Sequence, residues 1–395
     1  MKILLLNGHG INLRVDGAKL FITDGRFSTN SEPLKYIFSP RKIDVEHIVV
    51  YGRNGNITID AIRWLVKHGV QISILNWNGK LLTTMLPAES VQVKTKLAQY
   101  STYGSSEREK IARLFLVAKF EHTQNVLNYL KTRYPQINND FSKEIAFFRK
   151  AKTISEMMMV EGRIASFYWQ ELTKIFPEKY EFETREYQKR PRGAGDVINC
   201  LLNYGYAILE AECLKAINTA GLDAHVGFLH EMNMGKNSLA YDLQEPFRFL
   251  IDMAVIQLIE SRTLEKTDFI RTETYTLRLR PNGAKKLTKA IEDMLNRKVS
   301  FLGQNWGWRY VISEKTTHLA HYLIGKRKNL DFVEPNEVLH RLDNEEIRKK
   351  ISEISYTEWM KLGFSKGTLF YMKKNARVKK PFTLNKHVFQ RIKEI

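Results

Sequence analysis

The spacing of apolar residues changes once along this chain, near residue 88, and this change constrains the fold most strongly. Before it, short apolar runs such as Ile3–Leu5 and His47–Tyr51 are separated by glycines, which is typical of β-strands joined by turns. One helix interrupts the strands, with Thr58 as its N-cap and an end near His68. From about residue 89 to 324, apolar residues recur at helical spacing. The sequence therefore predicts an α+β protein.

The last part of the chain, residues 355–395, is strongly basic, with ten Lys or Arg and two acids. Apolar residues such as Trp359 and Leu369 are interspersed, so a small helical core is expected. Gly363 is placed to end one helix and Ser365 to cap the next, as in a helix-turn-helix. Its DNA-binding residues would be Lys366, Thr368, Tyr371, Lys373, Lys374 and Arg377. The alternative is an ordinary basic helical hairpin at a surface.

Three domains are therefore expected. They are a small N-terminal β-domain with one helix over residues 1–88, a large all-α domain over residues 89–340, and a basic helix-turn-helix over residues 341–395.

The net charge of +19 indicates a polyanionic partner, because Lys and Arg gain affinity by displacing the counterions of nucleic-acid phosphates. Two cysteines, Cys200 and Cys213, are too few for a disulfide framework or a structural zinc site. Charges interrupt every apolar run before about 18 residues, so no transmembrane helix is expected. We expect a soluble cytoplasmic protein that associates with DNA and not with a membrane.

The tract most suited to catalysis is Asp223–Arg248, which contains His230, Asp242 and Glu245. A histidine with carboxylates suits Mn²⁺ or Mg²⁺, ions that polarise a phosphate and activate a hydroxyl in phosphodiester chemistry. The residues alone slightly favour a structural alternative. In it, Asp242 caps a helix, Glu245 pairs with Arg248 and His230 is a core residue.

Several blocks of the sequence resemble the CRISPR-associated spacer-acquisition integrase family over roughly residues 1–330. The blocks are Gly52–Thr58, Glu161–Trp169 with the Glu-Gly motif, Asp196–Asn199, Leu202–Leu209, Ala220–Glu231 and Ser238–Arg248. Their number and order make the resemblance specific.

This resemblance implies a metal site formed by Glu161, His230 and Glu245, with Asp242 as a further acid near the metal. The implied cofactor is Mn²⁺ or Mg²⁺, and the implied reaction is transesterification in which a DNA 3′-hydroxyl attacks a phosphodiester of the target. Arg185, Arg190, Arg192 and Arg248 are expected to contact phosphates. The alternative for Arg248 is a salt bridge with Asp242 or Glu245, and for Arg190 and Arg192 a solvated loop.

The resemblance also implies that the N-terminal β-domain serves in dimerisation and DNA contact, within a homodimer that becomes a tetramer on DNA. Members that act in CRISPR adaptation usually end soon after the helical domain, whereas this chain continues into the basic C-terminal tract. In this it resembles casposases, transposon-encoded relatives that must recognise their own terminal inverted repeats. The expected function is a casposon integrase. A CRISPR adaptation integrase and a non-catalytic architectural DNA-binding protein are the alternatives.

Overall fold

Two units make up the computed structural model of the chain. The structure describes residues 2–26, 32–76, 79–86, 92–185, 194–271, 276–302, 304–333, 345–361 and 366–377. The first unit comprises Met1–Arg297 and Trp306–Glu334, and the second comprises Lys298–Asn305 and Pro335–Ile395. The first unit holds both an N-terminal sheet and a helical body. The expected mixed α+β class is confirmed at this level, and the division into domains 1–88, 89–340 and 341–395 stays a prediction.

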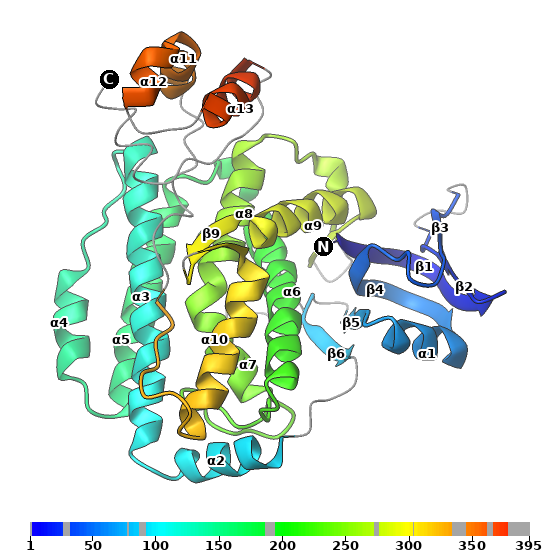
Figure 1. Ribbon diagram of the computed structural model, residues 1–395, viewed down its shortest axis with the longest axis horizontal. Helices are drawn as coiled ribbons and strands as arrows, with labels where there is room; N and C mark the ends of the chain where they lie inside the picture. The colour runs from blue at the N-terminus through cyan, green and yellow to red at the C-terminus, as the bar shows by residue number, and fades with distance from the viewer. Residues whose placement is uncertain are drawn as a thin grey trace. The chain divides into compact units, whose positions relative to one another are not determined.

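A six-stranded mixed sheet forms the N-terminal part of the first unit, with strand order β3-β2-β1-β4-β5-β6 (Figure 1). Strand β1 pairs in parallel with β4, and β4 in parallel with β5, whereas the remaining pairs are antiparallel. The strands are β1 (Lys2–Asp16), β2 (Lys19–Thr23), β3 (Lys35–Phe38), β4 (Val45–Ile57), β5 (Gln71–Leu75) and β6 (Leu81–Met85).

Helix α1 (Ile59–Lys67) connects β4 to β5 and packs on this sheet. Its N-cap is Thr58, whose hydroxyl accepts a hydrogen bond from the Ala61 backbone nitrogen at 3.1 Å. The cap and the extent of this helix confirm the sequence prediction. Trp64 and Leu65 of α1 are buried in the same cluster as the apolar residues of the strands, so the sheet has its own core.

The helical body follows the sheet in the chain. Its elements are α2 (Val93–Tyr103), α3 (Glu107–Arg133), α4 (Ser142–Lys150), α5 (Ile154–Thr173), η1 (Glu178–Tyr180), α6 (Val197–Thr219), α7 (Ser238–Gln244), η2 (Glu245–Phe247), α8 (Arg248–Glu260), η3 (Lys266–Asp268), β7 (Phe269–Arg271), β8 (Leu277–Leu279), α9 (Pro281–Asn296) and α10 (Trp308–Leu323). Strands β9 (Lys298–Phe301) and β10 (Gln304–Gly307) lie between α9 and α10 in the chain. The expectation that residues 89–340 are all helical is therefore wrong in one respect, because β7–β8 and β9–β10 each form a two-stranded sheet there.

Helix α6 runs through the centre of this body and is buried on all its faces. It packs against α7, α8 and α10. Gly205 allows α8 to approach closely, because a Cβ there would lie 2.3 Å from the side chain of Ile251. Helix α5 and η2 both pack against the long helix α3. Because α8 follows directly on η2, this packing sets where the residues at the start of α8 lie.

A buried polar cluster joins the sheet to the helical body. The imidazole of His47 on β4 lies 3.2 Å from Glu212 Oε1 on α6 and 2.8 Å from the hydroxyl of Ser73 on β5. Arg309 Nε lies 3.3 Å from the other carboxylate oxygen of Glu212. Gln71 on β5 donates to the Ala211 carbonyl at 2.8 Å. The sheet is thus attached to α6 through specific polar contacts that apolar spacing does not predict.

This cluster should make the stability of the protein depend on pH. Burial by itself would raise the pKa of Glu212, but the hydrogen bond with His47 and the charge of Arg309 lower it from 4.5 to about 2. A lowered pKa gives stability that is complete above pH 4.5 and is lost as pH falls towards 2. We expect Glu212→Gln to reduce the free energy of unfolding by about 3 kcal/mol at pH 7. Urea denaturation at pH 7 and pH 3 should show a smaller difference at pH 3, and an equal difference would contradict this account.

The described part of the second unit includes three helices, α11 (Glu345–Glu353), α12 (Tyr356–Lys361) and α13 (Lys366–Arg377). Ile351, Trp359, Leu369 and Met372 are buried and form a small core. The helix expected to end near residue 362 and the helix expected from Lys366 are both present. The connecting residues 362–365 and the last residues, 378–395, lie outside the described residues. Whether these helices form a helix-turn-helix therefore stays a prediction.

In the part of the chain that the structure describes, no helix is both long and apolar enough to cross a membrane.

Candidate active site

Glu161 from α5 and Glu245 from η2 meet at the side chain of Lys119 from α3. The Lys119 ammonium nitrogen lies 2.5 Å from Glu161 Oε1 and 2.5 Å from Glu245 Oε2. Lys119 and Glu161 retain 16% and 17% of their side-chain exposure, and Glu245 retains 8%. Two acids that are far apart in the sequence therefore face one position, which a positive charge occupies.

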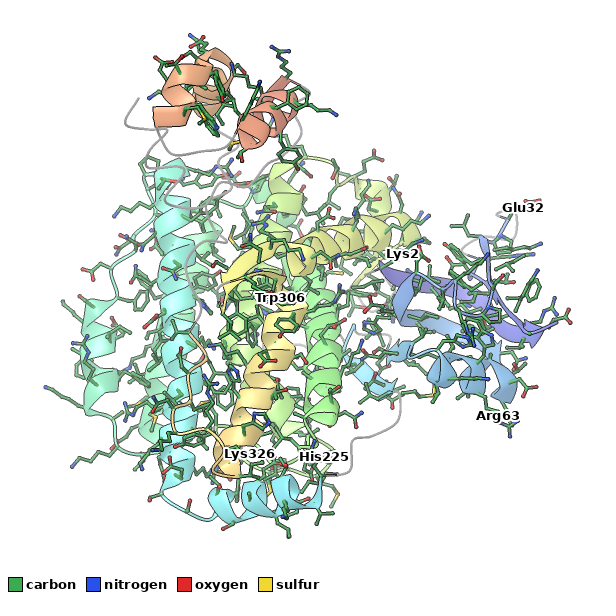
Figure 2. All side chains as sticks on the ribbon, in the orientation of Figure 1. Lys2, Glu32, Arg63, His225, Trp306 and Lys326 are labelled. Atoms are coloured by element: carbon green, nitrogen blue, oxygen red, sulfur yellow. The ribbon has the colours of Figure 1, made fainter. Side chains whose placement is uncertain are left out.

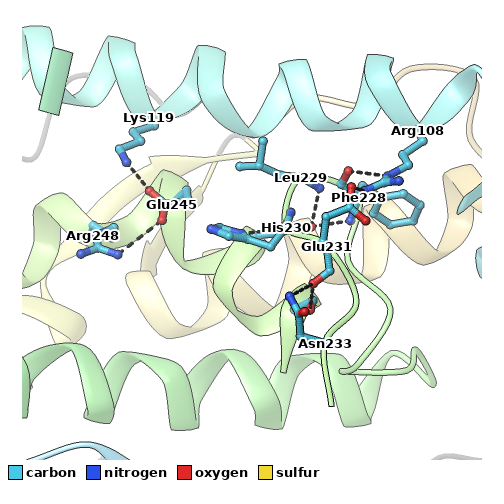
Figure 3. A network of polar contacts seen from close by, with 11 residues as sticks. Arg108, Lys119, Phe228, Leu229, His230, Glu231, Asn233, Glu245 and Arg248 are labelled. Carbon is cyan, nitrogen blue, oxygen red and sulfur yellow. Dashed lines mark hydrogen bonds and ion pairs between the residues drawn. The ribbon is translucent and has the colours of Figure 1, made fainter. Parts of the chain in front are cut away.

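His230 lies beside these acids, in the loop between α6 and α7. In Figure 3 its imidazole extends towards Glu245, whose carboxylate lies between Lys119 and Arg248. His230 Nδ1 is 2.7 Å from Asp242 Oδ1. An Nδ1–H donated to Asp242 leaves Nε2 as a lone-pair donor, the form in which histidine binds a metal. The side chain is 31% exposed. This exposure does not fit the alternative interpretation of the sequence, in which His230 is a core residue rather than a metal ligand.

Asp242 holds the loop that carries His230. Its Oδ2 accepts hydrogen bonds from the backbone nitrogens of Phe228 (2.5 Å) and Leu229 (2.9 Å), and its Oδ1 accepts one from that of His230 (2.9 Å). The side chain has no solvent exposure. Gly227 makes this approach possible, because a Cβ there would lie 2.8 Å from Asp242 Oδ2. Both oxygens of Asp242 are therefore engaged by the loop and by His230.

Two further side chains hold the same loop from outside. Gln99 of α2 donates to the carbonyls of Asp223 and Val226 at 2.9 and 2.7 Å and accepts from the Asp223 backbone nitrogen at 2.8 Å. Arg108 of α3 donates to the Phe228 carbonyl at 3.0 Å (Figure 3). His225 lies on this loop beside α2, near the end of the helical body (Figure 2), and is exposed. The loop thus presents His230 to the acids and His225 to the surface.

Arg248 lies at the start of α8, against Glu245. Its guanidinium is 3.3 Å from Glu245 Oε1 and 4.1 Å from the centroid of the Tyr206 ring. The salt bridge considered from the sequence is therefore present. Arg185, by contrast, is 9% exposed and donates to the side-chain oxygens of Asn199 and Asn203 at 2.5 and 2.7 Å. This burial does not favour the predicted phosphate contact of Arg185, and Arg190 and Arg192 lie outside the described residues.

The charges around the two acids set the protonation of the site. Burial by itself would raise the pKa of Glu245, but Lys119, Arg248 and His230 lower it to about 2. Burial would lower the pKa of His230, but the hydrogen bond and charge of Asp242 raise it above its ordinary value. Glu245 is therefore ionised at neutral pH and attracts a cation, as a metal ligand must.

The donor set fits a divalent cation of the Mn²⁺ or Mg²⁺ type. Two carboxylates and one imidazole nitrogen suit these ions, and the Lys119 ammonium stands between the carboxylates as a cation of lower charge. Among the residues that the structure describes, no three His, Cys, Asp or Glu side chains are grouped closely enough to hold a metal without rearrangement. Movement of Lys119 from between the two acids would free the carboxylate oxygens that it contacts.

A small cavity extends from this site into the helical body. Lys119, Glu245 and Arg248 line one part of it, and Tyr168, Tyr206 and Asp252 line another. Asp252 accepts hydrogen bonds from the hydroxyls of Tyr168 and Tyr206. Burial raises the pKa of Asp252, although the bonds from the two hydroxyls oppose that shift. Lys119, Gln99 and Tyr206 could not be identified as site residues from the sequence, because the segments that carry them show only helical spacing.

The predicted DNA-binding residues of the second unit lie on α13. Lys366, Thr368, Tyr371, Lys374 and Arg377 are exposed and Lys373 is half-buried. Leu369, Met372 and Ala376 of the same helix are buried. One side of α13 is therefore apolar and buried, and the other is basic and open to a partner.

Comparison with known proteins places this geometry in a family context. The family described as CRISPR associated protein Cas1 matches residues 4–293. A CRISPR-associated endonuclease Cas1 of Archaeoglobus fulgidus is 28% identical over 351 residues, which is 84% of this chain and 99% of that protein. Another, of Thermus thermophilus, is 29% identical and covers 72% of this chain and 84% of that protein.

Solved structures are similar over nearly the whole chain. A casposase bound to an integration product is 55% identical, with a TM-score of 0.86, and covers 90% of this chain and 100% of the other. A CAS1 protein of Thermotoga maritima has a TM-score of 0.68 at 22% identity and covers 85% of this chain and 99% of the other. The second likeness concerns the fold alone.

Proposed function

The chain belongs to the Cas1 family, which matches residues 4–293, and on that premise we propose that it is a casposon integrase. It joins the 3′-hydroxyl ends of transposon DNA to target DNA by metal-dependent transesterification. One observation carries the proposal: Glu161, on α5, and Glu245, on η2, face a single cation position beside His230. The family resemblance assigns the same three residues to the metal. The sequence identity of 55% to a casposase, against 28% and 29% to two Cas1 endonucleases, supports the transposon-encoded branch.

Glu161, Glu245 and Nε2 of His230 are the proposed ligands of Mn²⁺ or Mg²⁺. When bound, such a cation activates the attacking hydroxyl and neutralises the charge that develops on the phosphate. Asp242 orients His230 through Nδ1 and is a positioning residue rather than a ligand, because both its oxygens already accept hydrogen bonds.

Arg248 is the proposed phosphate contact of the catalytic site. Its guanidinium is held between Glu245 and the face of Tyr206, and a guanidinium presents paired donors that suit a phosphate. The nucleophile belongs to DNA, so the protein need not supply one. The two cysteines are buried and burial raises the pKa of both thiols, which makes a thiolate nucleophile unfavourable.

The second unit is proposed to bind the transposon ends as a helix-turn-helix. The support for this is the exposed face of α13, with the basic side chains Lys366, Lys374 and Arg377 beside Thr368 and Tyr371, and with Lys373 half-buried next to them. Such a face combines phosphate contacts with groups that can reach base edges. Double-stranded DNA, both transposon ends and target, is the proposed partner, bound by a homodimer that forms a tetramer on DNA.

The proposed function is tested by incubating the purified full-length protein with Mn²⁺, a target plasmid and duplexes that carry the terminal inverted repeats of its own transposon. We expect covalent joining of the duplexes to the plasmid without a second protein. Duplexes with dideoxy 3′ ends should not be joined, because they lack the attacking hydroxyl. Joining that requires a second CRISPR protein would instead favour a CRISPR adaptation integrase, and no joining under any condition would contradict both.

The same assay tests the second unit. A protein that ends before Ser355 should lose about tenfold or more in its preference for inverted-repeat ends over scrambled ends, since each base contact contributes about 1–3 kcal/mol of discrimination. Metal binding by the truncated protein should be unchanged. Equal end preference in the truncated and full-length proteins would exclude end recognition by this unit.

A further inference from the structure

Lys119 occupies the position between Glu161 and Glu245 that a divalent cation would take. Its ammonium nitrogen is 2.5 Å from an oxygen of each acid. The three side chains retain between 8% and 17% of their exposure, so water screens this pair of contacts weakly. A positive charge of the protein therefore already binds both carboxylates that are proposed to bind the metal.

The second cation of the site differs from Lys119 in how it is held. Arg248 is planar and is fixed between Glu245 and the ring of Tyr206. The lysine ammonium, by contrast, is a compact charge on a flexible four-carbon stem, which can change its rotamers without a change in α3. Of the two, Lys119 is the cation that can leave the carboxylates.

Charge balance indicates what is required for Lys119 to move away from the two carboxylates. The two carboxylates are matched by the charges of Lys119 and Arg248, so a divalent cation added beside them would face two positive charges. A DNA phosphate in the site supplies negative charge and a new partner for the ammonium. The carboxylates then become available to the metal.

We infer that Lys119 makes metal loading depend on DNA: the ammonium holds Glu161 and Glu245 when DNA is absent and moves to a phosphate when DNA binds. The inference rests on the proposed function, because it takes these two acids as the metal ligands. By linkage, DNA then raises the affinity for the metal, and the metal raises the affinity for DNA by the same factor.

The test measures Mn²⁺ affinity by isothermal titration calorimetry for the full-length protein and its Lys119→Met variant. Each is titrated alone and with a short blunt-ended DNA duplex, at one ionic strength. Without DNA, the variant should bind Mn²⁺ about tenfold more tightly than the wild type, because no ammonium competes for the carboxylates. The duplex should strengthen Mn²⁺ binding about tenfold in the wild type and much less in the variant.

Lys110→Met is the matched control, since Lys110 is on the same helix and pairs at the surface with Glu107 at 2.8 Å. It should behave as the wild type. Lys119→Gln provides a second neutral side chain, and the rise of the melting temperature with Mn²⁺ provides a second measure of binding. Both Lys119 variants should show a larger rise than the wild type in the absence of DNA.

Two outcomes would contradict the inference in different ways. Mn²⁺ affinity in both Lys119 variants that is equal to or weaker than that of the wild type overturns the role of Lys119 and leaves the metal site in place. No Mn²⁺ binding by any of the proteins, with or without DNA, overturns the proposed metal site and this inference together. A Lys119→Met protein that folds only when Mn²⁺ is present supports the inference, because the metal then replaces the missing ammonium.

Discussion

Glu245→Gln should reduce the rate of strand transfer about a thousandfold or more, while DNA binding measured without a divalent cation stays close to that of the wild type. The amide keeps the size of the side chain but removes the charge that attracts the cation, and a bound cation contributes several kcal/mol to stabilising the transition state. Glu161→Gln should have an effect of the same order, because the two carboxylates face the same position. The measurement is single-turnover joining of transposon-end duplexes to a plasmid, with fluorescence anisotropy for DNA binding.

Glu178→Gln is the control for the loss of one acidic group, since Glu178 is exposed and lies in η1. It should join DNA at the wild-type rate. Because Glu245 is buried between two cations, the melting temperature of each variant must also be compared with that of the wild type. Full strand transfer by a folded Glu245→Gln protein would contradict the metal site, and with it the proposed chemistry.

Asp242→Ala should have the largest effect on stability, about 3–5 kcal/mol. The substitution leaves the backbone nitrogens of Phe228, Leu229 and His230 without their buried acceptor and frees the His230 ring. Asp242→Asn should also destabilise the protein, because its amide nitrogen cannot accept hydrogen bonds. For the folded Asn variant, we expect Mn²⁺ affinity to fall about 10- to 100-fold, as when the partner of a metal-bound histidine is lost. Urea denaturation and Mn²⁺ titration measure the two effects.

Asp223→Asn is the matched control, because Asp223 lies on the same loop and is only half-buried. Its carboxylate accepts one backbone hydrogen bond, from His225, and one from the Tyr100 hydroxyl. Its loss should cost less stability and leave Mn²⁺ affinity unchanged. Equal losses of Mn²⁺ affinity in the two Asn variants would show that Asp242 supports the loop without orienting His230.

Features that depend only on residues close together in the chain could be predicted from the sequence. The spacing of apolar residues and the cap at Thr58 predicted a strand-rich N-terminal region and α1, because a strand face repeats every two residues and an N-cap bonds within three. The same reasoning predicted the helices that end at Lys361 and begin at Lys366. The resemblance, rather than local spacing, brought Glu161 into the site, since Glu161 is on a different helix from Glu245.

Features that depend on contacts between distant elements could not be predicted from local spacing in the sequence. From their short spacing alone, Asp242 and Glu245 were equal candidates for acids at a metal site. In the fold, Asp242 accepts hydrogen bonds from the backbone of residues 228–230, whereas Glu245 contacts Lys119. Arg185 was predicted from the sequence to contact a phosphate, whereas in the fold its buried side chain donates to Asn199 and Asn203 of α6.

The sequence by itself therefore determined the α+β class, the order of a strand-rich start and a mainly helical body, and the basic character of the C-terminal tract, all of which follow from residue type and local spacing. Only the tertiary structure decided that Lys119 stands between the two acids and that Asp242 orients His230. The physical reason is that a buried charge is stable only beside its partners. Those partners come from α3, α5 and η2, which become neighbours only when the helices pack.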